Sequence, residues 1–207
     1  MSHTFALLMP VKTLTLAKSR LDVPQPAQRE PLMRAFALDA IAAASQATGV
    51  ARVYVVTDEP GFEVHGAVRL PDEGDGDLNR ALHHASVRVR LLDPSMAVAA
   101  MCADLPSLDP ADLDAGLAAG LTPRWFVADA SGSGTTLLAA GPGVDLDPHF
   151  GVGSARRHEE SGASPVRAEL RTLRMDVDTE ADLAAAREMG IGPHTTRALE
   201  SADHSTR

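Results

Sequence analysis

Short apolar runs alternate with helix-period stretches along the whole chain, and this alternation constrains the fold more than any other feature. Runs suited to buried strands occupy residues 5–11, 52–58, 67–71, 96–106, 124–129, 135–141 and 170–178. Helix signals occupy residues 31–48, 77–92, 109 onward, 154–162 and 180–190. Continuous apolar strands separated by helices predict an α/β fold, in which helices cover both faces of a mostly parallel central sheet.

The 207 residues suit one domain with one sizeable core. The sequence shows no internal repeat and no linker that would divide it. We therefore expect a single domain over residues 1–192 and a polar, flexible tail over residues 193–207.

The composition excludes several classes of function. A formal net charge of -9 and an aromatic fraction of 3% argue against nucleic-acid binding, which needs a basic face and stacking side chains. The single cysteine, Cys102, allows neither a disulfide framework nor a cysteine zinc site. No run approaches the ~20 apolar residues of a membrane helix, and no signal peptide is evident, so we expect a cytoplasmic protein with no membrane partner.

Ligands of parallel α/β sheets bind at the carboxyl ends of the strands, which directs attention to the residues just after each run. Lys12 follows the first run, Asp58 the second and Asp104 the central one. A glycine-rich turn joins the next two runs, and two aspartates close the last one. These positions are the candidate site.

Asp176, Val177 and Asp178 form a DxD pair at the end of the last expected strand. Residues i and i+2 of a strand share a face about 6.5 Å apart, so both carboxylates can approach a divalent cation. A simpler interpretation is helix capping, with Asp178 and Thr179 satisfying the free N–H groups of the following helix.

Asp104 adds a third carboxylate to this pair. It stands directly after the central apolar run, where a metal ligand is suited, although an aspartate in a turn before a proline is common without any metal. Carboxylate oxygens together with water suit Mg²⁺. The three aspartates predict a magnesium site more strongly than either part does.

Two glycine-rich stretches, "SGSGTT" (131–136) and "FGVGSARRH" (150–158), suggest anion binding. The first is not a dinucleotide fingerprint, because a strand follows it and the third glycine is missing. Backbone N–H groups of such a turn, or of the helix that the second stretch opens, can approach an anion. Each stretch taken singly can also be an ordinary turn or a helix cap.

Only two lysines occur in the chain, Lys12 and Lys18, and with Arg20 they lie next to the first strand. They form either a solvated basic loop or a phosphate site. Asn79 follows an acidic, glycine-rich loop and is suited to a base or ribose edge, although a helix start capped by Asp77 explains this stretch as well. We interpret all eight histidines as structural or exposed.

Six ordered blocks carry a family resemblance: "PVK…AKSRL", "LNRAL", "ADLPSL", "FVADASGSGTTLL", "FGVGSARRH" and "MDVDT..DL". Together they resemble the guanylyltransferases of deazaflavin coenzyme F-420 biosynthesis, the CofC or FbiD type, which act on 2-phospho-L-lactate or phosphoenolpyruvate. The resemblance runs from Pro10 to Gly192. It implies a nucleotidyltransferase-like, Rossmann-type three-layer sandwich and a Mg²⁺-dependent transfer of GMP from GTP with release of pyrophosphate.

The resemblance also implies roles for individual residues. Lys12 would hold the acceptor phosphate as a catalytic residue. The other catalytic residues would be the three metal ligands, Asp104, Asp176 and Asp178.

For the substrates, the resemblance implies a second set of positions. The carboxylate of the phosphorylated three-carbon acid would rest on the N–H groups of Thr135 and Gly151 and on the Ser154 hydroxyl. The nucleotide would be bound by Lys18, Arg20 and Asn79.

Two other functions stay open at this stage. A DxD pair with a metal is also typical of sugar-nucleotide transferases, and a non-catalytic nucleotide-binding protein would carry similar charges. The sequence does not reveal the preferred acid or the oligomeric state, and a homodimer is left open.

Overall fold

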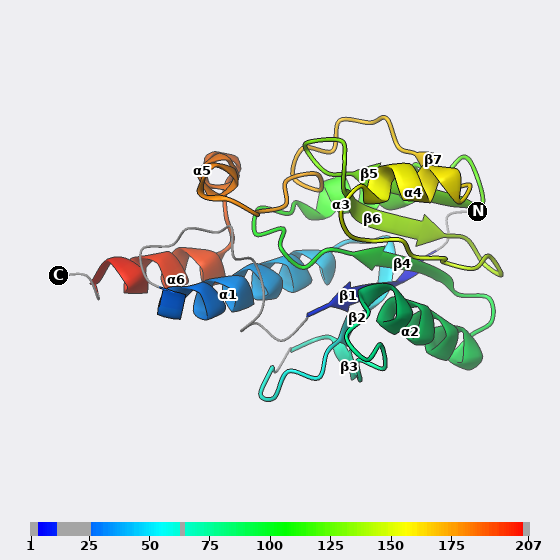
Figure 1. Cartoon of the computed structure of the whole chain (residues 1–207), viewed down its shortest axis with the longest axis horizontal. Coiled ribbons are helices and arrows are strands. Elements are labelled where there is room, and N and C mark those ends of the chain that lie inside the picture. Colours follow the sequence, from blue (N-terminus) through cyan, green and yellow to red (C-terminus); the bar gives the residue numbers. More distant parts are fainter. Residues whose placement is uncertain (1–3, 12–25, 63–64, 205–207) are drawn as a thin grey trace.

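The computed structural model describes residues 4–11, 26–62 and 65–204, which build one seven-stranded sheet with helices on both faces (Figure 1). The strands are β1 (Phe5–Pro10), β2 (Val50–Val56), β3 (Val68–Leu70), β4 (Ala97–Met101), β5 (Arg124–Ala128), β6 (Thr135–Ala140) and β7 (Ser164–Pro165). The helices are α1 (Pro26–Ala44), α2 (Leu78–Leu92), α3 (Pro110–Ala118), α4 (Ser154–Glu160), α5 (Glu180–Met189) and α6 (Pro193–His204). None of these helices, over the described residues, has the length and hydropathy that a bilayer crossing requires.

The strands lie in the order β3-β2-β1-β4-β6-β5-β7. β1 pairs in parallel with β2 and β4, and the pairs β2–β3 and β5–β7 are also parallel. Only β6 is reversed among the described strands, since it pairs antiparallel with both β4 and β5. The predicted α/β fold with a mostly parallel sheet is therefore confirmed, and the amino end of β6 joins the edge where the parallel strands end.

Strand residues alternate between two buried clusters, as expected for a sheet covered on both faces. In β1, Leu7 and Met9 pack in a cluster with residues of α1, α3 and α5. Their neighbours Ala6 and Leu8 pack on the other face with residues of α2 and α4. All four side chains are at most 1% exposed. The three layers follow from this alternation.

Polar residues start α3 and α5 where the sequence predicts, whereas α1 begins at Pro26, before the expected start at residue 31. The Asp109 carboxylate accepts a hydrogen bond from Ala111 N, and Pro110 stands in the first turn of α3. Thr179 and Asp182 form a reciprocal capping box at the start of α5.

The expected strand over residues 170–178 is wrong. These residues form turns and an extended crossing segment, and they pair with no strand of the described sheet. Their apolar side chains, including Leu173 and Val177, still reach the core, both at 0% exposure. Alternating apolar residues are therefore buried here by an extended chain that crosses the end of the sheet.

Residues 193–204, expected from the sequence as part of a polar, flexible tail, instead form α6 beside α1 (Figure 1). Asp39 of α1 is buried, and its carboxylate accepts hydrogen bonds from His194 N (2.9 Å) and Thr195 N (2.8 Å) at the start of α6. A negative charge at a helix N-terminus is stabilising. Gly192 permits this approach, because a Cβ there would lie 2.3 Å from the Asp39 carboxylate carbon.

Candidate active site

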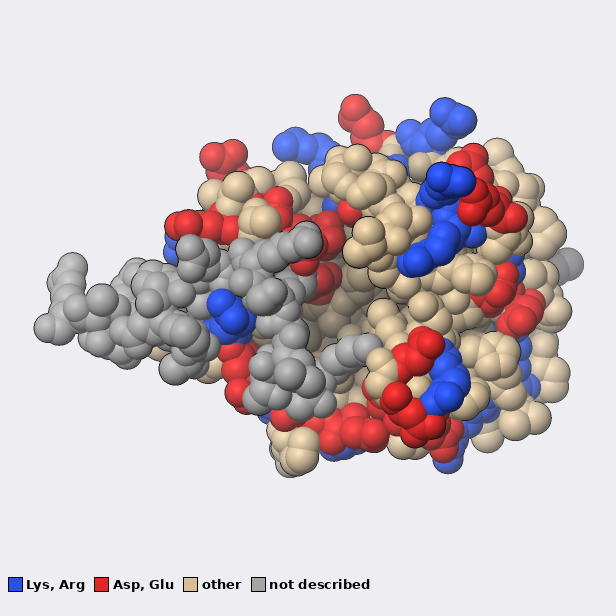
Figure 2. Space-filling model, viewed as in Figure 1, with Lys and Arg blue, Asp and Glu red and all other residues tan. Residues whose placement is uncertain are grey.

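The candidate site lies at the edge of the sheet where the parallel strands end and β6 begins. Cys102, just past β4, donates its N–H to the carbonyl oxygen of Thr136 in β6 (2.9 Å). Asp104 and Thr135 therefore belong to the same edge, although their strands run in opposite directions. In the view of Figure 2 the molecule is hollowed in the middle of this face, and acidic side chains line part of the hollow.

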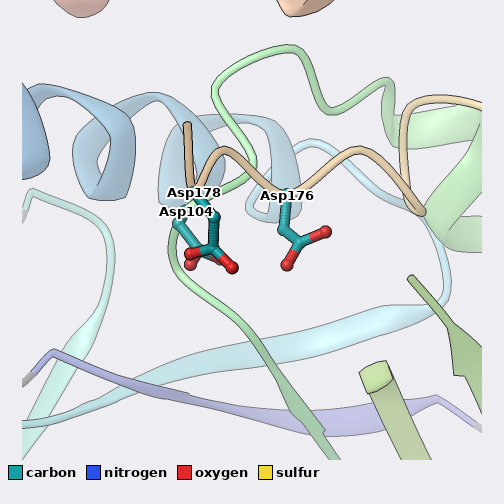
Figure 3. Close-up of side chains that lie close together, drawn as sticks. All are labelled: Asp104, Asp176 and Asp178. Carbon is teal, nitrogen blue, oxygen red and sulfur yellow. The ribbon is translucent and has the colours of Figure 1, made fainter. Parts of the chain in front are cut away.

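Three aspartates, Asp104, Asp176 and Asp178, form an acidic triad at this edge. One carboxylate oxygen from each of them lies within 4.8 Å of the other two, and Figure 3 shows the three side chains pointing to the same side. The backbone joins the two segments directly, since Val177 N donates to the carbonyl oxygen of Asp104 (3.0 Å). The convergence that the sequence predicted for these residues is thus present.

The geometry of the acidic triad fits a magnesium ion. Oxygen ligands about 2.1 Å from one Mg²⁺ lie at most about 4.2 Å apart. The 4.8 Å limit on the carboxylate oxygens exceeds that span by little, which a small side-chain rotation can close. Carboxylates are also the hard oxygen ligands that Mg²⁺ prefers.

The alternative interpretation of Asp178 as a helix cap is only partly met. Thr179 is the cap of α5, and its hydroxyl accepts from Asp182 N. The Asp182 carboxylate in turn accepts from the backbone N–H groups of Asp178 (3.2 Å) and Thr179 (2.8 Å). The capping box therefore fixes the backbone of Asp178, while its carboxylate takes part in the acidic triad.

The two glycine-rich stretches lie side by side. Ala155 N, in the first turn of α4, donates to the carbonyl oxygen of Ser133 in the turn before β6 (3.2 Å). Thr135 and Ser154 are 5% and 1% exposed, so their hydroxyls lie inside this junction. Gly151 has φ +113°, a backbone conformation that favours glycine. The structure thus brings together the three residues that the resemblance assigns to the acceptor.

Asn79, at the start of α2, faces residues 149–151, which we call the acceptor turn. Its Oδ1 accepts from Phe150 N (2.6 Å), and its Nδ2 donates to Phe150 O (3.1 Å). Asp77 caps α2 through the N–H groups of Asn79 and Arg80, as the simpler interpretation of this stretch expects. The amide is directed at the acceptor turn, and its contact with the nucleotide stays a prediction.

Sequence reasoning missed the position of His158 in this junction. The side chain is 0% exposed, with Nδ1 2.9 Å from Thr135 Oγ1 and Nε2 accepting from His149 N (2.9 Å). The one local signal is spacing, because His158 follows Ser154 by four residues and shares its face of α4.

The predicted cations Lys12, Lys18 and Arg20 lie outside the described residues. The described segment before them ends at Val11, whose N–H donates to Val56 O (3.0 Å). The buried hydroxyl of Thr57 donates to Val11 O (2.6 Å). The last described residue before Lys12 is thus anchored at the same edge of the sheet as the acidic triad.

Comparison with known proteins agrees with this geometry. A family model described as "Guanylyl transferase CofC like" matches residues 5–202. The phosphoenolpyruvate guanylyltransferase of Streptomyces scabiei (strain 87.22) is 48% identical over 205 residues, which cover 94% of this chain and 95% of that protein.

Two solved structures share the fold. A candidate nucleotide-diphospho-sugar transferase from Desulfovibrio desulfuricans G20 has a TM-score of 0.72 at 17% identity, covering 99% of this chain and 96% of that chain. A CMP:2-keto-3-deoxy-manno-octonic acid synthetase complexed with CTP has a TM-score of 0.53 at 16% identity, covering 90% and 98%. At these identities the likeness concerns the fold alone, and it confirms the predicted nucleotidyltransferase-like architecture.

The family match spans almost all of the chain, and the curated relative is similar over nearly its whole length. Both findings confirm the resemblance that the six sequence blocks indicate. The chain belongs to the CofC-like guanylyltransferase family.

Proposed function

We propose that this chain transfers GMP from GTP to the phosphate of phosphoenolpyruvate and releases pyrophosphate, as a step in deazaflavin coenzyme F-420 biosynthesis. The observation that carries the proposal is the acidic triad, whose oxygens lie within 4.8 Å of one another beside two glycine-rich turns. The name of the Streptomyces scabiei relative supports phosphoenolpyruvate over 2-phospho-L-lactate as the acceptor.

In this proposal Asp104, Asp176 and Asp178 hold Mg²⁺. The bound ion supplies positive charge that offsets the repulsion between the acceptor phosphate and the triphosphate. The chain's own task is to hold the three carboxylates at a fixed spacing. The bond from Val177 N to Asp104 O and the capping box of α5 support that task.

The acceptor would be held at both of its ends. Its carboxylate would rest on the N–H groups of Thr135 and Gly151 and on the Ser154 hydroxyl. Lys12 would place its ammonium group on the acceptor phosphate, where a fixed point charge binds well. The junction between the glycine-rich turns supports the first of these roles, because it places Thr135, Gly151 and Ser154 within one small region.

The nucleotide would be bound through the phosphates by Lys18 and Arg20 and through the guanosine by Asn79. The pairing of Asn79 with Phe150 favours an additional role on the acceptor side.

The reaction is an in-line displacement. An oxygen of the acceptor phosphate bonds to the α-phosphorus of GTP, and the bond from that phosphorus to the oxygen bridging to the β-phosphate breaks. Pyrophosphate leaves with the electron pair. The acceptor phosphate is already ionised at neutral pH, so the step needs no general base. The protein contributes position and positive charge, which are the main sources of rate in phosphoryl transfer.

The test is to incubate the purified protein with GTP and Mg²⁺ and, in separate reactions, phosphoenolpyruvate, 2-phospho-L-lactate or 3-phosphoglycerate. We expect pyrophosphate and a product whose mass equals phosphoenolpyruvate joined to GMP. A parallel incubation replaces GTP with a nucleotide sugar. Transfer of the sugar there, without pyrophosphate release from GTP in the first set, would instead identify a sugar-nucleotide transferase. Metal-dependent GTP binding with no turnover on any acid would identify a non-catalytic nucleotide-binding protein.

Replacing Lys12 tests the second half of the site. We expect Lys12→Ala to lower kcat by about 10²-fold or more, the usual scale for one preorganised electrostatic group. Arg52→Ala is the control, since it removes one exposed positive charge from β2. Near-normal pyrophosphate release by the Lys12 variant would count heavily against the assignment.

A further inference from the structure

Side chains hold the backbone of the acceptor turn on all sides. His149 N donates to His158 Nε2, and Arg157 donates from one terminal nitrogen to the carbonyl oxygen of His149 (3.0 Å). The Asn79 amide pairs with both backbone groups of Phe150, and the same Arg157 nitrogen also reaches Phe150 O (3.0 Å). All four backbone polar groups of residues 149 and 150 are therefore bound by side chains, so these side chains determine the shape of the turn.

Three side chains bind this backbone, those of Asn79, Arg157 and His158. Of these, only His158 also has a hydrogen bond to β6. Its Nε2 accepts the His149 N–H and therefore carries no proton. In a neutral imidazole the proton is then on Nδ1, which donates to Thr135 Oγ1 at 2.9 Å. One ring thus connects Thr135 to the acceptor turn.

The surroundings of His158 keep the ring neutral. It is 0% exposed and packs edge-on against Phe150, with ring centroids 5.2 Å apart. Burial lowers the pKa of His158 to about 4, because a charged imidazolium loses its hydration there. Neighbouring charged or titratable groups act on the same pKa: His149, Arg124 and Arg157 lower it, and Asp147 raises it.

We propose that His158 is a positioning residue of the acceptor site, whose Nδ1–H imidazole holds Thr135 and the acceptor turn at the spacing that an acceptor carboxylate needs. This inference rests on the proposed function, in which Thr135 and Gly151 supply N–H groups to that carboxylate. The position of Gly151 follows directly from the two preceding residues, and His158 binds the first of them. Preorganised donors cost no rearrangement when the ligand arrives.

The inference separates the two substrates. The acidic triad is positioned by the chain after β4 and by the segment before α5, whereas His158 contacts β6 and the acceptor turn. Loss of His158 contacts should therefore weaken binding of the acid, whereas Asn79 keeps its own bonds to Phe150 and GTP binding should stay nearly unchanged. Loss of a residue that only stabilises the fold would leave both KM values unchanged or would change both of them together.

Three variants of His158 remove its contacts with Thr135 and with His149 N separately or together. His158→Asn places an amide near the position of Nδ1 and keeps the contact with Thr135. His158→Gln reaches the position of Nε2 and keeps the contact with His149 N. His158→Phe keeps the ring volume and loses both contacts, and His65→Gln is the control at an exposed histidine before β3.

We expect the KM for phosphoenolpyruvate to rise roughly 10- to 100-fold in the Phe variant, because it loses two hydrogen bonds and each is worth up to about 10-fold at a buried site. The Asn and Gln variants should rise by less, and the KM for GTP should stay within about twofold in all of them. Thr135→Val combined with His158→Gln should add little to either single change, because both remove the same contact. If the Phe variant does not fold, the Asn and Gln variants decide the matter.

An unchanged acceptor KM in the folded variants, or equal rises for both substrates, would overturn the inference. A long-range ¹H–¹⁵N spectrum of the wild-type protein at pH 7 provides an independent readout, with Nδ1 expected as the protonated nitrogen of His158. A proton on Nε2 would also overturn it. If the wild type transfers GMP to no acid, the proposed function fails as well. Transfer by the wild type with an unchanged acceptor KM in the variants would refute this inference alone.

Discussion

Aspartates at the two ends of the sheet have opposite surroundings. Asp114 of α3 lies at the amino end of β2, and its carboxylate accepts hydrogen bonds from Thr48 N (3.0 Å), Thr48 Oγ1 (2.7 Å) and Gly49 N (2.7 Å). At the other end, the carboxylates of the acidic triad approach one another within 4.8 Å. Donors surround the first carboxylate, whereas carboxylates of like charge gather in the triad.

This difference separates a structural from a functional use of the same residue type. Hydrogen bonds to an ionised carboxylate favour the folded state, so Asp114 contributes to stability by itself. Like charges a few ångströms apart repel, so the mutual repulsion within the acidic triad is a cost to folding that neighbouring positive charge must offset. Sites that serve activity commonly carry such a cost.

The largest expected effect comes from breaking the acidic triad. Asp176→Asn and Asp178→Asn keep the side-chain size, and each should lower GMP transfer by about 10²-fold or more while weakening its dependence on Mg²⁺. Pyrophosphate release measured over a magnesium series would show this. Activity that survives in a chelator would remove the proposed role of the triad.

Local signals explain the features that the sequence predicts correctly. Apolar runs such as 96–106 and caps such as Thr179 depend on neighbours a few residues away, and both are found in the structure. The position of Asp104 was predictable because parallel strands bring the residues that come after them to one edge. The DxD pair meets Asp104 by another route, since the segment that carries it is not a strand of the sheet and bonds through Val177 N to Asp104 O.

Features that depend on distant partners were not predictable. The segment 170–178 has the alternation of a strand, but Val177 N bonds to Asp104 O instead of a neighbouring strand. The polar tail becomes α6 because Asp39, more than 150 residues earlier, accepts its first N–H groups. His158 looks like any helix histidine until its partners 23 and 9 residues away are known.

Asp39 offers a second structural carboxylate for the comparison. Asp39→Ala should lower the free energy of unfolding by about 1–2 kcal/mol, since it removes the acceptor of two N–H groups at the start of α6. Chemical denaturation measures this loss, and GMP transfer at a temperature where the variant is folded should stay near normal. Gly192→Ala should act in the same direction, because its Cβ displaces the Asp39 carboxylate. A loss of activity as large as that of Asp178→Asn would contradict the division between the two kinds of aspartate.

The smallest effect concerns Asp114 and its dependence on pH. Burial alone would raise the pKa of Asp114, but hydrogen bonds from Gly49 N and from the hydroxyl and N–H of Thr48 outweigh it and hold the pKa below the usual 3.8. The unfolded chain therefore binds a proton on this carboxyl at a higher pH than the folded protein does. The stabilising contribution is fully present above pH 3.8 and is lost as the pH falls through the lower, folded-state pKa.

Asp114→Asn cannot titrate, so its stability relative to the wild type reports this contribution. Near pH 7 the variant should be less stable by about 1 kcal/mol, because the neutral amide keeps only part of the hydrogen bonding that the charged carboxylate makes. As the pH falls below 3.8 the two unfolding curves should converge. Urea denaturation from pH 7 to pH 3 measures the difference in free energy of unfolding between the two proteins. A difference that stays constant over this range would mean that the charge of Asp114 contributes nothing to stability. Protonation of Asp114 therefore lowers the stability of the fold, because the charged form is the one that its hydrogen bonds favour. Protonation of a carboxylate in the acidic triad has the opposite effect on the repulsion within the triad, which it reduces.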